Sequence, residues 1–145
     1  MKDVREALMV GRNTEGKLVR RPISPFMLGS AYQFQMSSAT SILHRITGVG
    51  LGLGTLLFTA WLVAAAAGDS AFSLVQALLA SWVGLFVLFC FTLSLFYHFC
   101  NGIRHLAWDV GKGFELPAMH RSGALVIAAT IILTVAFWVI AFLIG

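Results

Sequence analysis

The chain has 145 residues, of which 59% are hydrophobic and only 11% are charged, and its mean hydropathy is +0.87. So few polar residues cannot cover the surface of a water-soluble globule, which indicates a membrane protein. The formal net charge is +4. We interpret this excess of basic residues as a signal of membrane orientation rather than of nucleic-acid binding.

The first 40 residues differ in composition from the rest. Residues 1 to about 24 are polar and basic, and Pro22 and Pro25 disfavour a helix, so we expect an extended or irregular cytoplasmic arm. Residues 26–40 are mixed and uncharged, and could lie at the membrane surface. We therefore predict an N-terminal arm with an interfacial segment over 1–40 and a transmembrane anchor domain over 41–145.

Three apolar runs follow, over residues 46–67, 78–99 and 125–144, and none contains a charged residue. Each is long enough to cross a hydrocarbon core of about 30 Å as a helix. We therefore predict an all-α membrane protein with three transmembrane helices. So small a chain buries little surface against itself, so we expect it to form part of a heteromeric helical bundle.

The first span contains glycines at positions 48, 50, 52 and 54, which form the pairs Gly48/Gly52 and Gly50/Gly54. Glycines four residues apart allow another helix, or a cofactor, to approach the backbone closely. A nucleotide-binding interpretation of the alternating glycines is rejected, because no strand precedes them.

The loops between the spans differ in charge. All ten Lys and Arg residues precede or open the first span, or lie between the second and third spans. The positive-inside rule then places the N-terminus and the 101–123 loop in the cytoplasm, or in the matrix of a mitochondrion. Because no signal or transit peptide is visible, we expect the inner membrane of a bacterium. We expect a short loop at 68–70, and an irregular 101–123 loop after an initial helical extension.

His98 is the most informative residue, because an ionisable side chain inside a span usually faces a partner, a cavity or a cofactor. It lies about 9 Å deeper than Arg104, the first charge after the run. Haem is the leading candidate ligand, and a hydrogen bond to a neighbouring helix is the alternative. His44 stands next to Arg45 at the membrane surface, and this depth difference argues against it as the second axial ligand. We therefore expect that ligand to come from another subunit.

Ser41, His44 and Arg45 form a second candidate site at the cytoplasmic end of the first span. Ser41 and Arg45 lie on one helical face, with His44 beside them. A hydroxyl, an imidazole and a cation together suit a quinone carbonyl or the propionates of a haem. The alternative is an interfacial anchor, in which Arg45 reaches the lipid headgroups and Ser41 caps the helix.

A third cluster combines Arg104 and His105 with Trp108 and Asp109. Arg104 could bind a carboxylate or phosphate through two hydrogen bonds, and Trp108 suits the headgroup layer. The alternative is an interfacial belt in which Arg104 pairs with Asp109.

Two motifs resemble those of a known family. They are Ser-Ile-Leu-His-Arg-Ile-Thr-Gly at 41–48, and the pattern that begins at His98 and continues through Gly-Ile-Arg-His-Leu at 102–106 to Trp-Asp at 108–109. Together with Arg-Pro-Ile-Ser-Pro at 21–25, they resemble the cytochrome b556 subunits of succinate dehydrogenase, which are membrane anchors of respiratory complex II. The resemblance covers the chain from about residue 21 to the third span.

The resemblance implies a role for each matching residue. His98 matches an axial ligand of haem b iron, with the second ligand supplied by a second anchor subunit. His44 and Arg45 match positions that contact the haem propionates, and Ser41 and Arg45 match residues that line the ubiquinone site. The implied partners are the second anchor, an iron–sulfur subunit and a flavoprotein subunit.

Such complexes link the tricarboxylic acid cycle to electron transport by oxidising succinate on the flavoprotein. The chain itself would carry no catalytic residue for succinate. Two alternatives remain open: the anchor of a fumarate reductase, and a structural anchor without haem.

Overall fold

The structure is a computed structural model, and it describes residues 10–20 and 35–144. The chain divides into two units, Met1–Gln35 and Met36–Gly145, which are described separately. This division lies a few residues before the domain boundary at residue 40 that we expect from the sequence. The part of the arm outside 10–20, and the interfacial segment up to residue 34, lie outside the described residues.

Residues 10–20 form a β-hairpin. Strand β1 (Val10–Arg12) pairs with β2 (Leu18–Arg20) in antiparallel register. In the turn, the Asn13 side chain accepts hydrogen bonds from backbone N–H groups two and four residues on, at 3.1 and 2.9 Å. Gly16 adopts a φ of 78°, which favours glycine. Of the two forms expected for the arm, extended and irregular, this stretch is largely extended, because an Asn/Gly turn joins two short β-forming segments.

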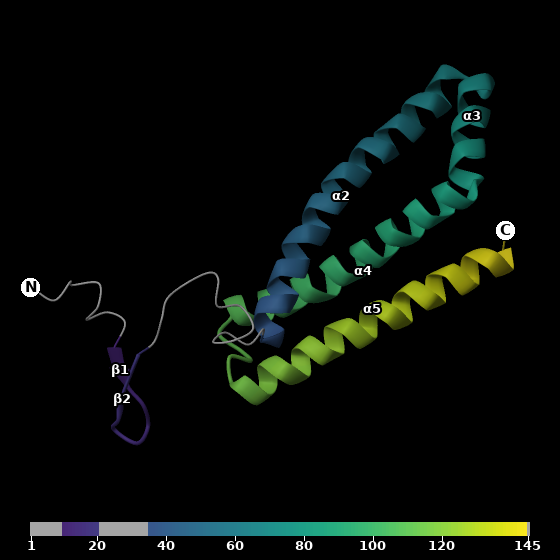
Figure 1. The fold of residues 1–145 in the computed structure, drawn as a ribbon. Coiled ribbons are helices and arrows are strands. Elements are labelled where there is room, and N and C mark those ends of the chain that lie inside the picture. The colour runs from purple at the N-terminus through teal and green to yellow at the C-terminus, as the bar shows by residue number, and fades with distance from the viewer. Residues whose placement is uncertain (1–9, 21–34, 145) are drawn as a thin grey trace, which may run out of the picture. The chain divides into compact units, whose positions relative to one another are not determined.

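The second unit consists of four helices: α2 (Met36–Ala67), α3 (Asp69–Ala80), α4 (Trp82–Asp109) and α5 (Leu116–Ile144). Helices α2, α4 and α5 are long and apolar enough to cross a membrane. The prediction of an all-α membrane protein with three transmembrane helices is confirmed for this unit. Figure 1 shows α4 running between α2 and α5 over the middle of the unit.

The spanning helices extend beyond the apolar runs at one end of the bundle. Helix α4 continues to Asp109, where Gly111 and Gly113 follow with positive φ values of 77° and 83°. Helix α5 begins at Leu116, and Pro117 stands in its first turn, where a missing N–H is harmless. The irregular part of the 101–123 loop is therefore confined to residues 110–115, which is much shorter than we expect from the sequence.

The turn between the first two spans contains a helix that we do not predict from the sequence. Gly68 ends α2 with a φ of 115°, and α3 follows at once. Ser81 then separates α3 from α4, and its side chain accepts a hydrogen bond from the Gly84 N–H at 3.2 Å. The second span therefore starts at Trp82, and the apolar residues before it belong to α3.

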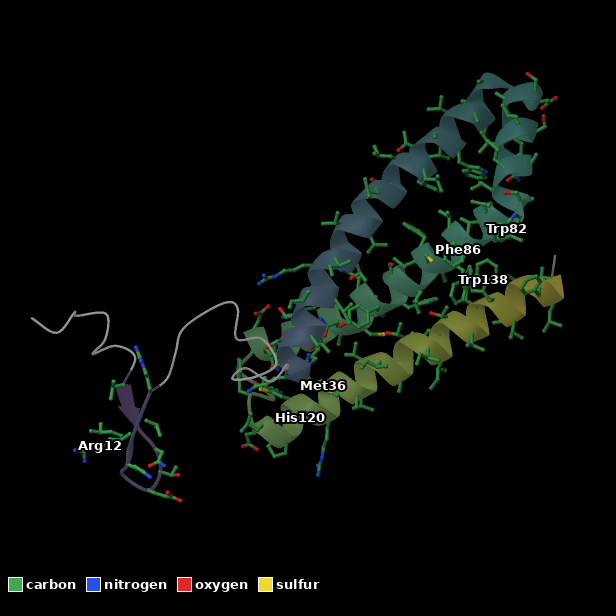
Figure 2. All side chains as sticks on the ribbon, viewed as in Figure 1. Arg12, Met36, Trp82, Phe86, His120 and Trp138 are labelled. Atoms are coloured by element: carbon green, nitrogen blue, oxygen red, sulfur yellow. The ribbon has the colours of Figure 1, made fainter. Side chains whose placement is uncertain are left out.

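Helices α2 and α4 lie close together at the end that carries Met36 and diverge toward α3 (Figure 1). At the close end, a Cβ atom on Gly123 of α5 would lie 2.8 Å from the Met36 sulfur, so α2 and α5 also meet there. Figure 2 shows Met36 and His120 at this same end, and Trp82 and Phe86 near the other.

The buried residues of this unit are mostly polar. Ala64, Tyr97 and Val126 are the buried apolar residues within the described part of the chain. The buried polar side chains are Thr40, Thr92, Asn101, Arg104, Thr130 and Thr134. Most large apolar side chains are exposed, as expected for helices that face lipid or partner subunits (Figure 2).

The glycines of α2 divide into two kinds. A Cβ atom on Gly48 would lie 3.1 Å from the His98 ring, and one on Gly54 would overlap the Phe91 ring. A Cβ atom on Gly50 or Gly52 would meet no atom of the described residues within 4 Å. Each predicted pair therefore contributes one glycine to the contact with α4 and leaves the other facing open space.

Candidate functional site

His44 and His98 face each other across the α2–α4 contact. Their rings are stacked, with centroids 3.8 Å apart and planes 10° apart. We call this pair the imidazole stack. The prediction that His44 and His98 lie at different depths is therefore wrong. Helix α2 begins well before the apolar run, so His44 lies in its third turn, and His98 lies about three turns before the end of α4.

The Nδ1 atom of His98 is held by α2. It lies 3.1 Å from the backbone carbonyl oxygen of His44 and 3.3 Å from the Thr47 hydroxyl. A hydrogen bond to a carbonyl requires a proton on Nδ1, which leaves the lone pair on Nε2. Histidines that bind metals are commonly oriented in this way, by a carbonyl that accepts from the other ring nitrogen. The environment of His98 therefore fits an axial haem ligand.

Gly48 completes the space around His98. A Cβ atom there would lie 3.1 Å from His98 Cε1, so any larger residue would press on the imidazole. The stacked rings leave no room for a macrocycle between them, because aromatic faces 3.8 Å apart are in contact. His44 is therefore not placed as the ligand opposite His98.

The Nδ1 atom of His44 is buried and has no hydrogen-bond partner among the residues that the structure describes. Such a nitrogen costs about 1–3 kcal/mol when left unsatisfied. The centre of the His105 ring lies 5.0 Å from the centre of the His44 ring, and the two ring planes are tilted by 40°. Within residues 10–20 and 35–144, no group of three or more His, Cys, Asp or Glu residues could hold a metal ion.

Ser41 and Arg45 lie one turn apart on α2, as expected from their spacing. Ser41 is half-buried, and Arg45 is exposed. A groove of about 320 Å³ lies between α2, α4 and α5 and includes neither residue. It is lined by Leu43, Thr47, Leu93, Ser94, Tyr97, Ile127, Thr130 and Ile131.

Arg104 is buried, with 6% of its surface exposed, and points into the bundle. Its Nε donates to the Ser122 hydroxyl at 2.9 Å, and its Nη2 donates to the Met119 carbonyl at 3.0 Å. Its Nη1 donates to the Thr40 hydroxyl at 2.7 Å and to Asn101 Oδ1 at 3.4 Å. The hydroxyl of Tyr97 and the amide of Asn101 also donate to the Thr40 carbonyl. We call this set the Arg104 cluster; its members are Thr40, Tyr97, Asn101, Arg104, Met119 and Ser122.

From the sequence, we expect Arg104 at the interface, as an anion ligand or as the partner of Asp109. The structure corrects this, because the guanidinium donates to neutral groups inside the bundle, while Asp109 is exposed. Trp108 covers the guanidinium, with its ring centre 4.2 Å from Cζ. A signal was available: Tyr97, Asn101 and Arg104 follow one another at intervals of four and three residues, which puts three polar side chains on one helix face.

Comparison with known proteins identifies the family of the chain. The family model of the succinate dehydrogenase/fumarate reductase transmembrane subunit matches residues 17–137. The chain belongs to this family. It is 38% identical to the succinate dehydrogenase cytochrome b556 subunit of Paracoccus denitrificans over 79% of this chain and 87% of that protein. It is 38% identical to the subunit of the same name from Rickettsia prowazekii, over 83% of this chain and 92% of that one.

A mitochondrial relative is similar over nearly the same length. The human succinate dehydrogenase cytochrome b560 subunit is 32% identical, over 89% of this chain and 82% of the human protein. The family match spans all three apolar helices and includes both the imidazole stack and the Arg104 cluster. The resemblance predicted from the two sequence motifs is confirmed, and the chain is a membrane anchor subunit of this type.

Proposed function

We propose that this anchor subunit binds haem b in succinate dehydrogenase and contributes to the reduction of ubiquinone. The observation that supports the proposal best is the hydrogen bonding of the His98 ring. Its Nδ1 lies within hydrogen-bond distance of the His44 carbonyl, so Nε2 would be available to an iron ion. When bound, haem b supplies one-electron transfer at a potential set by its ligands and surroundings.

His98 would hold the iron of haem b from this chain, and the second anchor subunit would supply a further ligand. The imidazole stack supports this division, because the ring of His44 is packed flat on that of His98. His44 and Arg45 bind the haem propionates. The Nδ1 atom of His44 has no partner among the described residues, which supports this role, because a proton on that atom could be donated to a carboxylate.

Ser41 and Arg45 bind the ubiquinone headgroup near the iron–sulfur subunit. The hydroxyl of Ser41 donates a hydrogen bond to a quinone carbonyl, and Arg45 stabilises negative charge that develops on the ring during reduction. The exposure of Arg45 supports this role, because the guanidinium is accessible to a ligand or a partner. Oxidation of succinate takes place on the flavoprotein subunit and involves no residue of this chain.

The subunit lies in the inner membrane of a bacterium, with its N-terminus in the cytoplasm. Lys112 and Arg121 lie at the end of the bundle where α4 and α5 are connected. The turn at α3, at the other end of the spans, carries Asp69 and no basic residue. This asymmetry is what the positive-inside rule associates with a cytoplasmic α4–α5 connection.

Orientation can be measured by labelling single cysteines in intact cells. In a background without Cys90 and Cys100, we expect Ser70→Cys to react with a membrane-impermeant thiol reagent added from outside. Lys112→Cys is the matched control, because it is also exposed but lies at the opposite end. It should react only after the membrane is opened. Labelling of Lys112→Cys alone in intact cells would reverse the proposed orientation.

An absorption spectrum of the purified complex tests the proposed function. We expect the bands of a reduced b-type haem when succinate is added. A spectrum without them would favour the structural anchor. A complex that contains haem but works with a low-potential quinone in its native membrane would favour the fumarate reductase alternative.

A further inference from the structure

The Arg104 cluster joins the three spanning helices at one level. Thr40 comes from α2, Asn101 and Arg104 come from α4, and Met119 and Ser122 come from α5. Their donors and acceptors are matched to one another across the helix contacts, and Asn101 has no exposed surface. A charged side chain at such a position in a membrane protein is costly and calls for a functional explanation.

Thr40 is the residue of α2 on which the contacts from α4 converge. Its hydroxyl accepts from Arg104 at 2.7 Å and lies 2.9 Å from the Met36 carbonyl, to which it donates. Its carbonyl accepts from the Tyr97 hydroxyl at 2.9 Å and from the Asn101 amide at 3.4 Å. Thr40 is 2% exposed. Three side chains of α4 therefore fix the position of α2 along its own axis, and its rotation about that axis, at this residue.

Thr40 stands next to the residues that carry the proposed chemistry. Ser41 follows it directly, and His44 lies one helical turn later on the same side as Thr40. A shift of α2 along α4 or a rotation of α2 at Thr40 would move the His44 carbonyl away from His98 Nδ1. It would also separate the stacked rings, which are now 3.8 Å apart.

We propose that Arg104 is a positioning residue that, through Thr40, sets the register of α2 against α4 and thereby orients His98 and places Ser41. This inference rests on the haem and quinone roles proposed above. A directional set of hydrogen bonds specifies one register, whereas apolar side chains in lipid would join the same helices without choosing between neighbouring registers. The competing explanation is that the cluster only holds the three helices together.

The test compares two variants of Thr40 in the assembled complex. Thr40→Val keeps the shape of the side chain and removes the hydroxyl that accepts from Arg104, and Thr40→Ser keeps the hydroxyl. We expect Thr40→Val to shift the absorption and electron paramagnetic resonance spectra of the haem, and to raise the KM for ubiquinone about fivefold, the equivalent of one hydrogen bond. Thr40→Ser should restore both. Thr55→Val, at an exposed threonine of the same helix, is the control.

Arg104→Gln should change the same two measurements in the same direction and by more. If it prevents assembly, Tyr97→Phe replaces it, because that change removes only the hydroxyl that donates to the Thr40 carbonyl. Wild-type spectra and KM values in the assembled variants would overturn the proposal. So would variants that lower the yield of complex while the remaining complex keeps wild-type spectra, because the cluster would then only join the helices.

Failure of the positioning role can be distinguished from failure of the proposed function. If haem b is absent, the wild-type complex itself lacks the b-type bands. If the positioning role is wrong, the wild-type complex has the bands and the Thr40 and Arg104 variants leave them unchanged.

Discussion

Replacing His98 with alanine is expected to abolish or strongly shift the reduced b-type absorption bands of the assembled complex. The imidazole is the chain's proposed iron ligand, and its Nδ1 is already engaged with the His44 carbonyl. Loss of a ligand would change the absorption spectrum and the reduction potential of a haem iron held by this residue. The measurement is a reduced-minus-oxidised spectrum, together with the ratio of haem to protein.

The control for this variant is His120→Ala. His120 is exposed, near the start of α5, and has no proposed role (Figure 2). It should leave the spectrum and the haem content unchanged. An unaltered spectrum and haem content in His98→Ala itself would remove His98 from the proposed ligand set.

Replacing Ser41 or Arg45 with alanine is expected to slow succinate-driven quinone reduction, while succinate oxidation by an artificial dye stays near the wild-type rate. Loss of one hydrogen bond from Ser41 costs on the order of 1 kcal/mol, which corresponds to about a fivefold effect. Loss of Arg45 should reduce the rate about tenfold or more, because its charge interacts most strongly with the partly reduced ring.

The two assays separate the quinone site from the rest of the complex, because the dye accepts electrons without using that site. Ser73→Ala and Arg121→Ala are suitable controls, since both residues are exposed and have no proposed role at the quinone site. If Ser41→Ala and Arg45→Ala assemble and reduce quinone at the wild-type rate, the two residues are interfacial anchors, as the alternative interpretation holds.

The three spans could be predicted because a helix in lipid must be apolar over its whole length, and each run is free of charge. The ends of the helices could not be predicted in this way. Helix α4 carries Asn101 and Arg104 past the apolar run, because their polar groups find partners on neighbouring helices. Such partners depend on tertiary packing, which hydropathy does not describe.

The candidate site could be predicted only in part. The identities of Ser41, His44, Arg45 and His98 follow from the two motifs, but their spatial relation does not. In the sequence, Arg45 and Arg104 both look like markers of the membrane surface, whereas Arg104 is buried inside the bundle. Arg104 therefore does not mark the membrane surface, and the depth of His98 cannot be measured from it. In the structure His44 and His98 lie at the same level and stack. Helix α3 could not be predicted, because its apolar residues continue directly into those of the next span.

The divergence of α2 and α4 toward α3 has a consequence for how the subunit responds to mechanical and thermal stress. The side-chain hydrogen bonds between spanning helices in the described residues gather at the end that carries His98 and Arg104. Toward α3, α2 meets its neighbours through apolar contacts such as that of Gly54 with Phe91.

Because lipid provides no hydrophobic force between helices, the two ends should differ in local stability. Amide hydrogen exchange in a lipid environment would be slow around Thr40 and Asn101 and faster near Trp61 and Phe72. The α3 end can then adjust to changes in bilayer thickness or to a partner helix, while the spacing of His44 and His98 at the other end stays constant.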